Sequence, residues 1–161
     1  MYLLDTNICI FAMKNTYPVL SQKLFRIPPS EIFVSSVTVG ELEYGCFKSK
    51  WGERTRNIMN LFLAAYTILP FDRDDAAVFG RIRADLAKTG SPIGPYDLQI
   101  AAQGIAKGLT IVTHNTENSA EFPALSLRTG SFDPVLIFLH GTFAVEHVFY
   151  CFQDQTAVVL S

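Results

Sequence analysis

The chain has 161 residues, a formal net charge of -2, 49% hydrophobic residues and 17% charged residues. These values are typical of a single globular domain and exclude disordered, collagen-like and disulfide-built proteins. A near-neutral balance of cations and acids also argues against strong nonspecific binding of nucleic acid. Cys9, Cys46 and Cys151 form neither a disulfide framework nor a zinc motif, and we find no signal peptide. We therefore expect a cytoplasmic protein.

Short apolar runs alternate with helical patterns over residues 1–113. In chain order, the pattern predicts a strand at 2–4, a helix capped by Asp5 or Thr6, a strand at 31–34, helices at 37–48 and 54–65, a strand at 67–69, helices at 72–88 and 96–107, and a strand at 109–113. Strands separated by helices are typical of a parallel sheet covered on both faces. The predicted fold class is therefore α/β.

Residues 132–161 differ in composition from the rest, because they contain no Lys or Arg and several short apolar runs. None of these runs reaches the roughly 20 residues that span a bilayer, so we expect no membrane helix. We divide the chain into a domain at 1–131 and an atypical apolar tail at 132–161, of unknown role.

Three carboxylates lie where the strands of the predicted sheet end. Asp5 follows the first predicted strand, and Glu41 lies in the helix after the second predicted strand. Asp97 lies at the start of the helix that precedes the last predicted strand. Ligand sites of parallel α/β sheets lie at this edge. Asp5 and Asp97 could each serve only as a helix cap. Together, however, converging carboxylates need a cation, and oxygen ligands favour Mg²⁺ or Mn²⁺, which could activate water against a phosphodiester.

Four segments carry a family resemblance. They are Tyr2-Leu3-Leu4-Asp5-Thr6-Asn7-Ile8; Val34 to Leu42 with Tyr44-Gly45; Pro92-Ile93-Gly94-Pro95-Tyr96-Asp97; and Ile111-Val112-Thr113-His114-Asn115. In this order and at these separations, the chain resembles PIN-domain ribonucleases of the VapC toxin type over about residues 1–127.

The resemblance implies a three-layer PIN-like fold, with a central mostly parallel sheet flanked by helices. It implies a Mg²⁺-dependent endoribonuclease that cuts structured RNA, such as tRNA or rRNA loops, and that is the dimeric toxin partner of a VapB-like antitoxin. Asp5, Glu41 and Asp97 would then hold the metal. The residues expected to orient these ligands are Thr6, Asn7, Ser36, Thr113 and Asn115.

The chain departs from the family pattern in two places. Asn115 stands where many PIN domains have a fourth acid, and Glu117 or Glu121 is a candidate replacement. The tail also continues for more than thirty residues beyond the segment 123–125, where such proteins usually end. A frame-shifted end and an added dimer or antitoxin contact surface both remain open as explanations.

Two other functions compete with the nuclease. A haloacid-dehalogenase-like phosphatase would need a second aspartate where the chain has Asn7. A catalytically impaired PIN-like domain that only binds RNA or antitoxin is the stronger alternative, motivated by Asn115 and the tail. Trp51 is expected in the core or a subunit interface, with RNA stacking as the alternative. Candidate phosphate contacts, equally explained as a solvated face, are Arg81, Arg83, Lys88 and Lys107.

Overall fold

The computed structural model describes residues 1–89, 94–114, 124–127 and 158–160. They contain a sheet of six strands in the order β3-β2-β1-β4-β5-β6. The strands are β1 (Tyr2–Leu4), β2 (Ile32–Ser35), β3 (Thr67–Leu69), β4 (Thr110–His114), β5 (Ala124–Leu127) and β6 (Val158–Leu160).

Strand β1 lies at the centre of the parallel part of the sheet. Leu3 is in register with Phe33 of β2 on one side and with Ile111 of β4 on the other. β3 extends the parallel part beyond β2, whereas β5 and β6 are antiparallel. The mostly parallel sheet predicted from the sequence is therefore confirmed.

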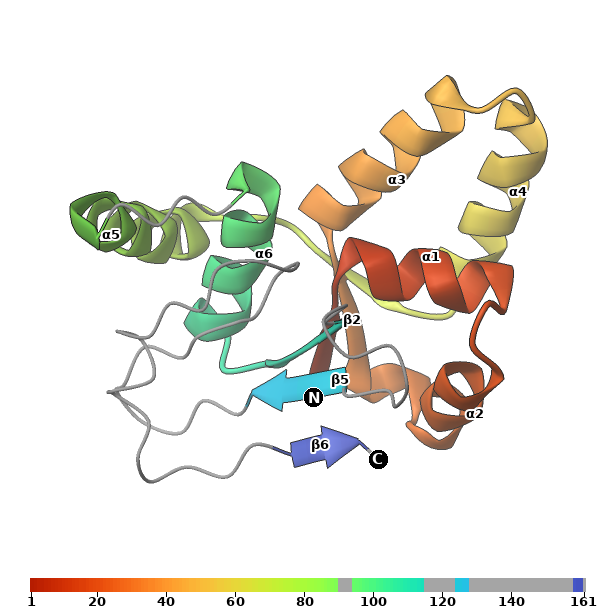
Figure 1. Ribbon diagram of the computed structural model, residues 1–161, viewed down its shortest axis with the longest axis horizontal. Coiled ribbons are helices and arrows are strands. Elements are labelled where there is room, and N and C mark those ends of the chain that lie inside the picture. Colours follow the sequence, from red (N-terminus) through yellow and green to blue (C-terminus); the bar gives the residue numbers. More distant parts are fainter. Residues whose placement is uncertain (90–93, 115–123, 128–157, 161) are drawn as a thin grey trace.

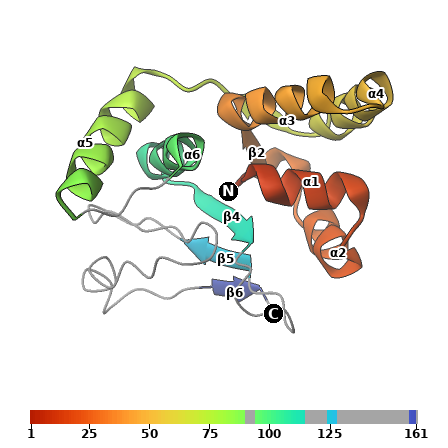
Figure 2. The ribbon, with the colours of Figure 1, turned by 45° about the horizontal axis from the view of Figure 1, so that its top comes forward.

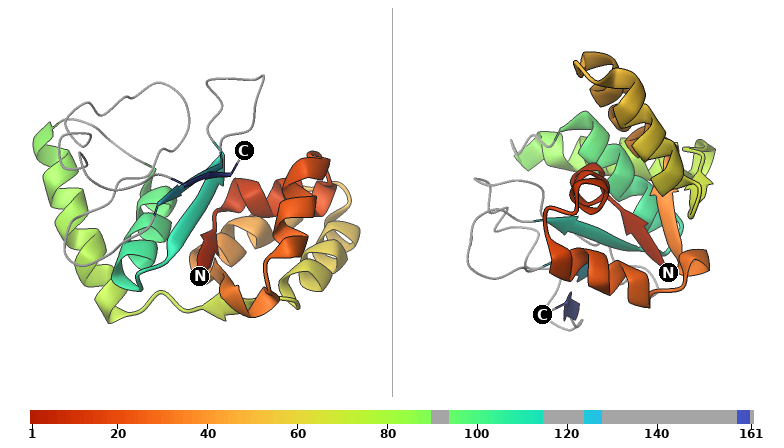
Figure 3. Two further views of the ribbon diagram at one scale, coloured as in Figure 1. Left: turned by 90° about the horizontal axis from the view of Figure 1, so that it is seen from below. Right: turned by 90° about the vertical axis from the view of Figure 1, so that its right-hand side faces the viewer.

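Helices cover both faces of this sheet, as Figures 1 and 3 show. The helices are α1 (Thr6–Lys14), α2 (Pro18–Arg26), α3 (Ser36–Lys48), α4 (Gly52–Leu63), α5 (Arg73–Thr89) and α6 (Pro95–Ala106), with a 3₁₀ turn at Pro29–Glu31. α1 to α4 gather at one end of the molecule, and α5 and α6 lie side by side at the other (Figure 2).

Strand alternation divides the core into two clusters. Leu4, Val34 and Val112 point to the face that α1 to α4 cover, and they pack with buried residues of those helices. Leu3 and Ile111 point to the opposite face, where they pack with residues of α6. Because successive strand residues face opposite sides, one short apolar run supplies both clusters. This two-sided burial holds the carboxyl ends of β1, β2 and β4 at one edge.

Most predicted elements are confirmed with ends shifted by one or two residues. The helix expected at 54–65 spans Gly52–Leu63, and the strand expected at 31–34 spans Ile32–Ser35. Helix α2 was not predicted from the sequence. It begins with Pro18 at its first position and buries only Leu20 and Leu24, which are four residues apart. The helical pattern of apolar residues therefore extends over a single turn, which is too short to predict a helix.

The tail contributes at least one strand, because β6 pairs with β5 at the edge of the sheet. The predicted boundary between residues 131 and 132 lies outside the described residues, so the domain division stays a prediction. Among the helices that the structure describes, none has the length and apolar character needed to span a bilayer.

Candidate active site

Asp5 is buried at the carboxyl end of β1, with 3% of its surface exposed. Its side chain caps α1, because Oδ1 accepts a hydrogen bond from the Ile8 N–H at 2.7 Å. Its other oxygen, Oδ2, accepts a hydrogen bond from the Thr113 hydroxyl at the end of β4. Asp5 therefore caps α1 with one oxygen and faces β4 with the other, so its role as a cap is compatible with the predicted role at the site.

Glu41 is brought to the same edge by α3. The Ser35 hydroxyl begins this helix by accepting the Val37 N–H at 3.1 Å. Glu41 lies one and a half turns later, half-buried, and its Oε2 accepts a hydrogen bond from the Thr6 hydroxyl. Since Thr6 follows Asp5 directly, this contact brings the second predicted carboxylate beside the first.

Asp97 lies in the first turn of α6, a helix that packs against α3. Its carboxylate folds back over Gly94, so a Cβ atom built on Gly94 would lie 2.8 Å from Asp97 Oδ2. A side chain at residue 94 would therefore displace the Asp97 carboxylate from the position it has in this structure. The Gly-Pro segment singled out in the sequence thus leaves the space that the Asp97 carboxylate occupies.

The remaining predicted site residues have varied placements. The Thr113 hydroxyl donates to Asp5, whereas the Thr6 hydroxyl donates to Glu41 and not to the preceding aspartate that the family resemblance implied it supports. Asn7 is half-buried in the first turn of α1. Asn115 and Glu117 lie outside the described residues, so their roles stay predictions.

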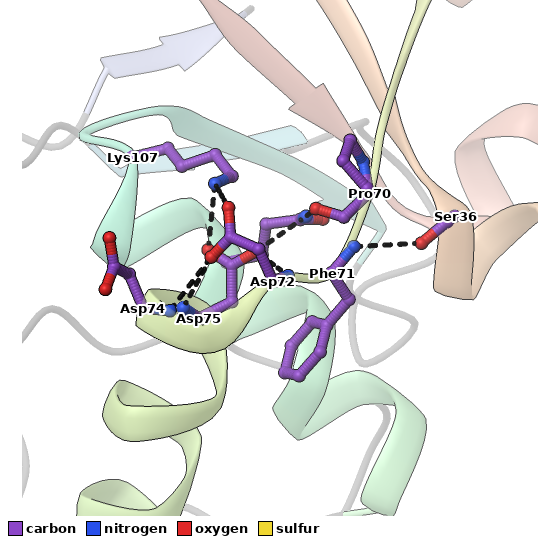
Figure 4. Close-up of polar contacts among 8 residues, drawn as sticks. Ser36, Pro70, Phe71, Asp72, Asp74, Asp75 and Lys107 are labelled. Atoms are coloured by element: carbon purple, nitrogen blue, oxygen red, sulfur yellow. Dashed lines mark hydrogen bonds and ion pairs between the residues drawn. The ribbon is translucent and has the colours of Figure 1, made fainter.

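Ser36 does not contact the carboxylates in the described hydrogen bonds. It is exposed at the start of α3, and its hydroxyl accepts the Phe71 N–H at 3.1 Å (Figure 4). Ser36 therefore ties the segment after β3 to the helix that carries Glu41.

A partly buried polar network continues from that segment to α6 (Figure 4). Asp75 is fully buried, and its Oδ2 accepts hydrogen bonds from the Asp72 N–H at 2.9 Å and from the Gln103 amide at 3.0 Å. Lys107 Nζ lies 2.7 Å from Asp72 Oδ2 and 3.2 Å from Asp75 Oδ1. Lys107, a predicted candidate for phosphate contact, is thus engaged by two acids and serves the packing of α5 against α6.

The charge of Asp5 also affects a neighbouring thiol. Burial raises the pKa of Cys9 well above its ordinary value, and the negative charge of Asp5 raises this pKa further. Cys9 therefore remains a neutral core residue beneath the site. Cys9 and Cys46 are both free thiols, as the sequence predicted.

The donor set fits a hard divalent cation in its chemistry, since Asp5, Glu41 and Asp97 offer only carboxylate oxygens. A carboxylate oxygen can accept more than one partner, so the bonds from Thr6 and Thr113 are compatible with metal binding. In the arrangement described, however, no three His, Cys, Asp or Glu side chains are gathered closely enough to hold a metal ion. The predicted metal site therefore stays a prediction.

A pocket of about 450 Å³ opens beside Glu41. It lies between α1, α3 and α4, and its walls are mostly apolar, with Ile10, Met13, Leu42 and Ile58 among the residues that line it. Glu41 at its wall connects this pocket to the carboxylate edge of the sheet.

Comparison with known protein families shows that the model of the PIN domain matches residues 2–122 of this chain. The chain is a VapC-type member of the PIN-domain family. It is 42% identical over 115 residues to the tRNA(fMet)-specific endonuclease VapC of Shigella flexneri, covering 71% of this chain and 86% of that protein. It is 37% identical over 127 residues to the enzyme of the same name from Salmonella typhimurium, covering 79% and 96%.

Solved structures agree with this assignment of the PIN domain. VapBC2 from Rickettsia felis, bound to a DNA fragment from its promoter, superposes with a TM-score of 0.68 at 34% identity, over 71% of this chain and 87% of that one. DNA-bound VapBC from Salmonella typhimurium gives 0.67 at 39% identity, over 70% and 85%. The PIN-like fold and the family expected from the sequence are thus confirmed.

Proposed function

We propose that this PIN domain is a Mg²⁺-dependent endoribonuclease, the toxin of a toxin–antitoxin pair, and that it cuts structured RNA of the tRNA or rRNA type. The observation that carries the proposal is the buried Asp5, bonded to Thr113, with Glu41 held beside it by Thr6. The similarity to two tRNA(fMet)-specific endonucleases supports the substrate class.

In this proposal each residue has a defined role. Asp5, Glu41 and Asp97 hold Mg²⁺, or Mn²⁺ in its place, and Glu117 is a candidate fourth ligand. A bound divalent ion would supply an activated water and charge stabilisation at the scissile phosphate. The Thr113 and Thr6 hydroxyls orient the Asp5 and Glu41 carboxylates, and Gly94 leaves room for Asp97. No side chain of the chain needs to act as nucleophile.

We further propose that a VapB-like antitoxin is its partner, that the toxin forms a homodimer, and that it acts in the cytoplasm. Several structural neighbours are complexes of a VapC protein with its VapB partner, which supports the antitoxin. The apolar pocket between α1, α3 and α4 is a suitable place for such a partner, because it adjoins Glu41.

The test is cleavage of a structured RNA pool that includes tRNA by the purified chain, with and without Mg²⁺. Wild-type protein is expected to cut in Mg²⁺ and to lose activity in EDTA. Asp5→Asn is expected to reduce the rate at least about 100-fold, because it removes a charged ligand. Asp85→Asn, an exposed acid of α5 that pairs with Lys88, is the matched control and should cut normally.

Two outcomes would contradict the proposal. Cleavage by nuclease-free preparations that survives both EDTA and Asp5→Asn would show that neither a metal ion nor Asp5 is needed. Folded protein, free of antitoxin, that binds RNA but never cuts it would favour the catalytically impaired binding domain instead.

A further inference from the structure

The tip of the α3–α4 hairpin, defined here as residues 43–56, carries three exposed aromatic rings. Tyr44 is 66% exposed, Phe47 is 79% exposed and Trp51 is 72% exposed. Of the places expected for Trp51, the core is wrong, because this residue lies at the turn between the two helices, whereas a subunit interface and RNA stacking stay predictions. Folding normally buries such rings, so three of them on one hairpin indicate a binding surface.

The hairpin tip is also cationic, although the chain as a whole has a net charge of -2. It contains four cations, Lys48, Lys50, Arg54 and Arg56, against two acids, Glu43 and Glu53, and so has a net charge of +2. Charge of this sign complements a polyanion. It provides the local basic surface that the overall composition concealed.

Two of these cations lie over the aromatic rings. The Arg56 guanidinium carbon is 4.4 Å from the centroid of the Phe47 ring, and Lys48 Nζ is 5.9 Å from that of Tyr44. Arg56 is held in place by Glu43, whose Oε2 accepts its Nη2 at 2.8 Å. Alternating rings and cations of this kind match bases and phosphates, which alternate along a single strand.

The hairpin tip is continuous with the candidate active site along α3. Tyr44 follows Glu41 by three residues and Lys48 follows it by seven, so these side chains lie along one stripe of the helix. At 1.5 Å per residue, Tyr44 lies roughly 5 Å and Phe47 roughly 9 Å along the axis from Glu41. The hairpin extends away from the sheet (Figure 1), so a chain leaving the site could follow it.

We propose that the hairpin tip binds single-stranded nucleotides of the RNA substrate next to the scissile phosphate. Tyr44, Phe47 and Trp51 stack on bases, while Lys48 and Lys50 contact phosphates. This inference rests on the proposed ribonuclease function and names a substrate surface for it. We favour RNA over a protein partner because the hairpin tip has a net charge of +2 and its exposed rings lie next to cations, which complements a polyanion with stacked bases.

Trp51 allows a direct test, because it is the single tryptophan of the chain. Full-length protein in EDTA, where cleavage is prevented, is titrated with a single-stranded oligoribonucleotide, and with tRNA in parallel. Stacking is expected to quench the Trp51 emission saturably, with a midpoint that matches binding measured by RNA fluorescence anisotropy.

Variants then separate this surface from nonspecific contacts. Phe47→Ala should weaken RNA binding about 5- to 150-fold, the range expected for loss of one stacked ring. Lys50→Glu should weaken it and reduce the salt dependence. Phe25→Ala is the matched control, because Phe25 is 89% exposed on α2, away from this hairpin, and should bind RNA normally. With Mg²⁺, Phe47→Ala should raise KM and leave kcat near that of the wild type.

Each outcome supports or overturns the inference. RNA that binds and is cut with no change in Trp51 emission, and with equal effects of Phe47→Ala and Phe25→Ala, would overturn it and leave the ribonuclease function standing. Trp51 emission that depends on protein concentration but not on RNA would make the hairpin tip a contact between copies. Folded, antitoxin-free protein that neither binds nor cuts RNA would remove both proposals.

Discussion

Thr113 and Thr110 are two buried threonines of the same strand, and only the first reaches the candidate site. The Thr113 hydroxyl donates to Asp5 at the carboxyl end of β4, whereas Thr110 lies at the opposite end, in register with Tyr2. A hydroxyl that orients a ligand differs in its effect from one that only packs in the strand. Valine has the same shape as threonine and lacks the donor, so it separates the two roles.

We predict that Thr113→Val weakens the response to Mg²⁺ about 10- to 100-fold, the usual cost of losing a group that orients a metal ligand. The measurement is the Mg²⁺ concentration that gives half-maximal cleavage, with the thermal midpoint of unfolding recorded alongside. Thr110→Val should leave the Mg²⁺ response unchanged. Equal effects of the two substitutions on the Mg²⁺ response would mean that the Thr113 hydroxyl has no role in orienting Asp5.

At the scale of elements, α6 lies unusually close to the sheet. A Cβ atom built on Gly104 would lie 2.4 Å from Ile111 Cδ1 and 3.7 Å from a Leu3 methyl group. Glycine therefore permits the contact between α6 and β4, in spite of its poor helix propensity. A Cβ atom built on Gly80 in α5 would have no atom within 4 Å, so glycine at this position only costs helix propensity.

These two glycines predict opposite effects of alanine. Gly104→Ala should lower the free energy of unfolding by roughly 1–3 kcal/mol, because the buried Ile111 and α6 must move apart. Gly80→Ala should raise it by up to about 1 kcal/mol, because alanine favours the helix. Urea denaturation of both variants gives the comparison. A neutral Gly104→Ala would show that the contact between α6 and β4 does not require glycine. A destabilising Gly80→Ala would show that the space around a glycine does not decide the effect of alanine.

At the scale of the whole molecule, the Asp72–Lys107 pair makes stability depend on pH. The hydrogen bond from Lys107 lowers the pKa of Asp72 below its ordinary 3.8, and the same bond raises the pKa of Lys107 above 10.5. The Asp72 contribution is present above pH 3.8 and is lost as the pH falls through the lowered pKa. The Lys107 contribution is complete below pH 10.5 and is lost as the pH rises through the raised pKa.

Asp72→Asn tests this dependence, because an amide oxygen can still accept the Asp74 and Asp75 N–H groups that Asp72 Oδ1 accepts. We expect a lower urea midpoint than that of the wild type at pH 7, and a difference that shrinks as the pH falls below 3.8. High salt should shrink it too, because the pair is partly exposed. A difference that is constant with pH would assign the effect to lost packing rather than to charge.

The sequence by itself determined the local features of this protein. Short apolar runs predicted β1 to β4, of which β1, β2 and β4 are buried on both faces, and helical periodicity predicted five of the six described helices within a few residues. The position of Asp5 after a strand, and of Glu41 and Asp97 in the first turns of helices, identified them as candidates, since ligand sites of parallel sheets lie at this edge. Helix α2, with one buried turn, gave too weak a pattern.

Only the tertiary structure decided which side chains meet. The bond from Thr113 to Asp5 spans 108 residues and the bond from Thr6 to Glu41 spans 35, and both follow from β1 lying between β2 and β4. Trp51 is exposed because the hairpin that carries it extends beyond the core. Periodicity specifies which face of an element is buried, whereas its neighbours depend on strand order and packing, which no local pattern contains.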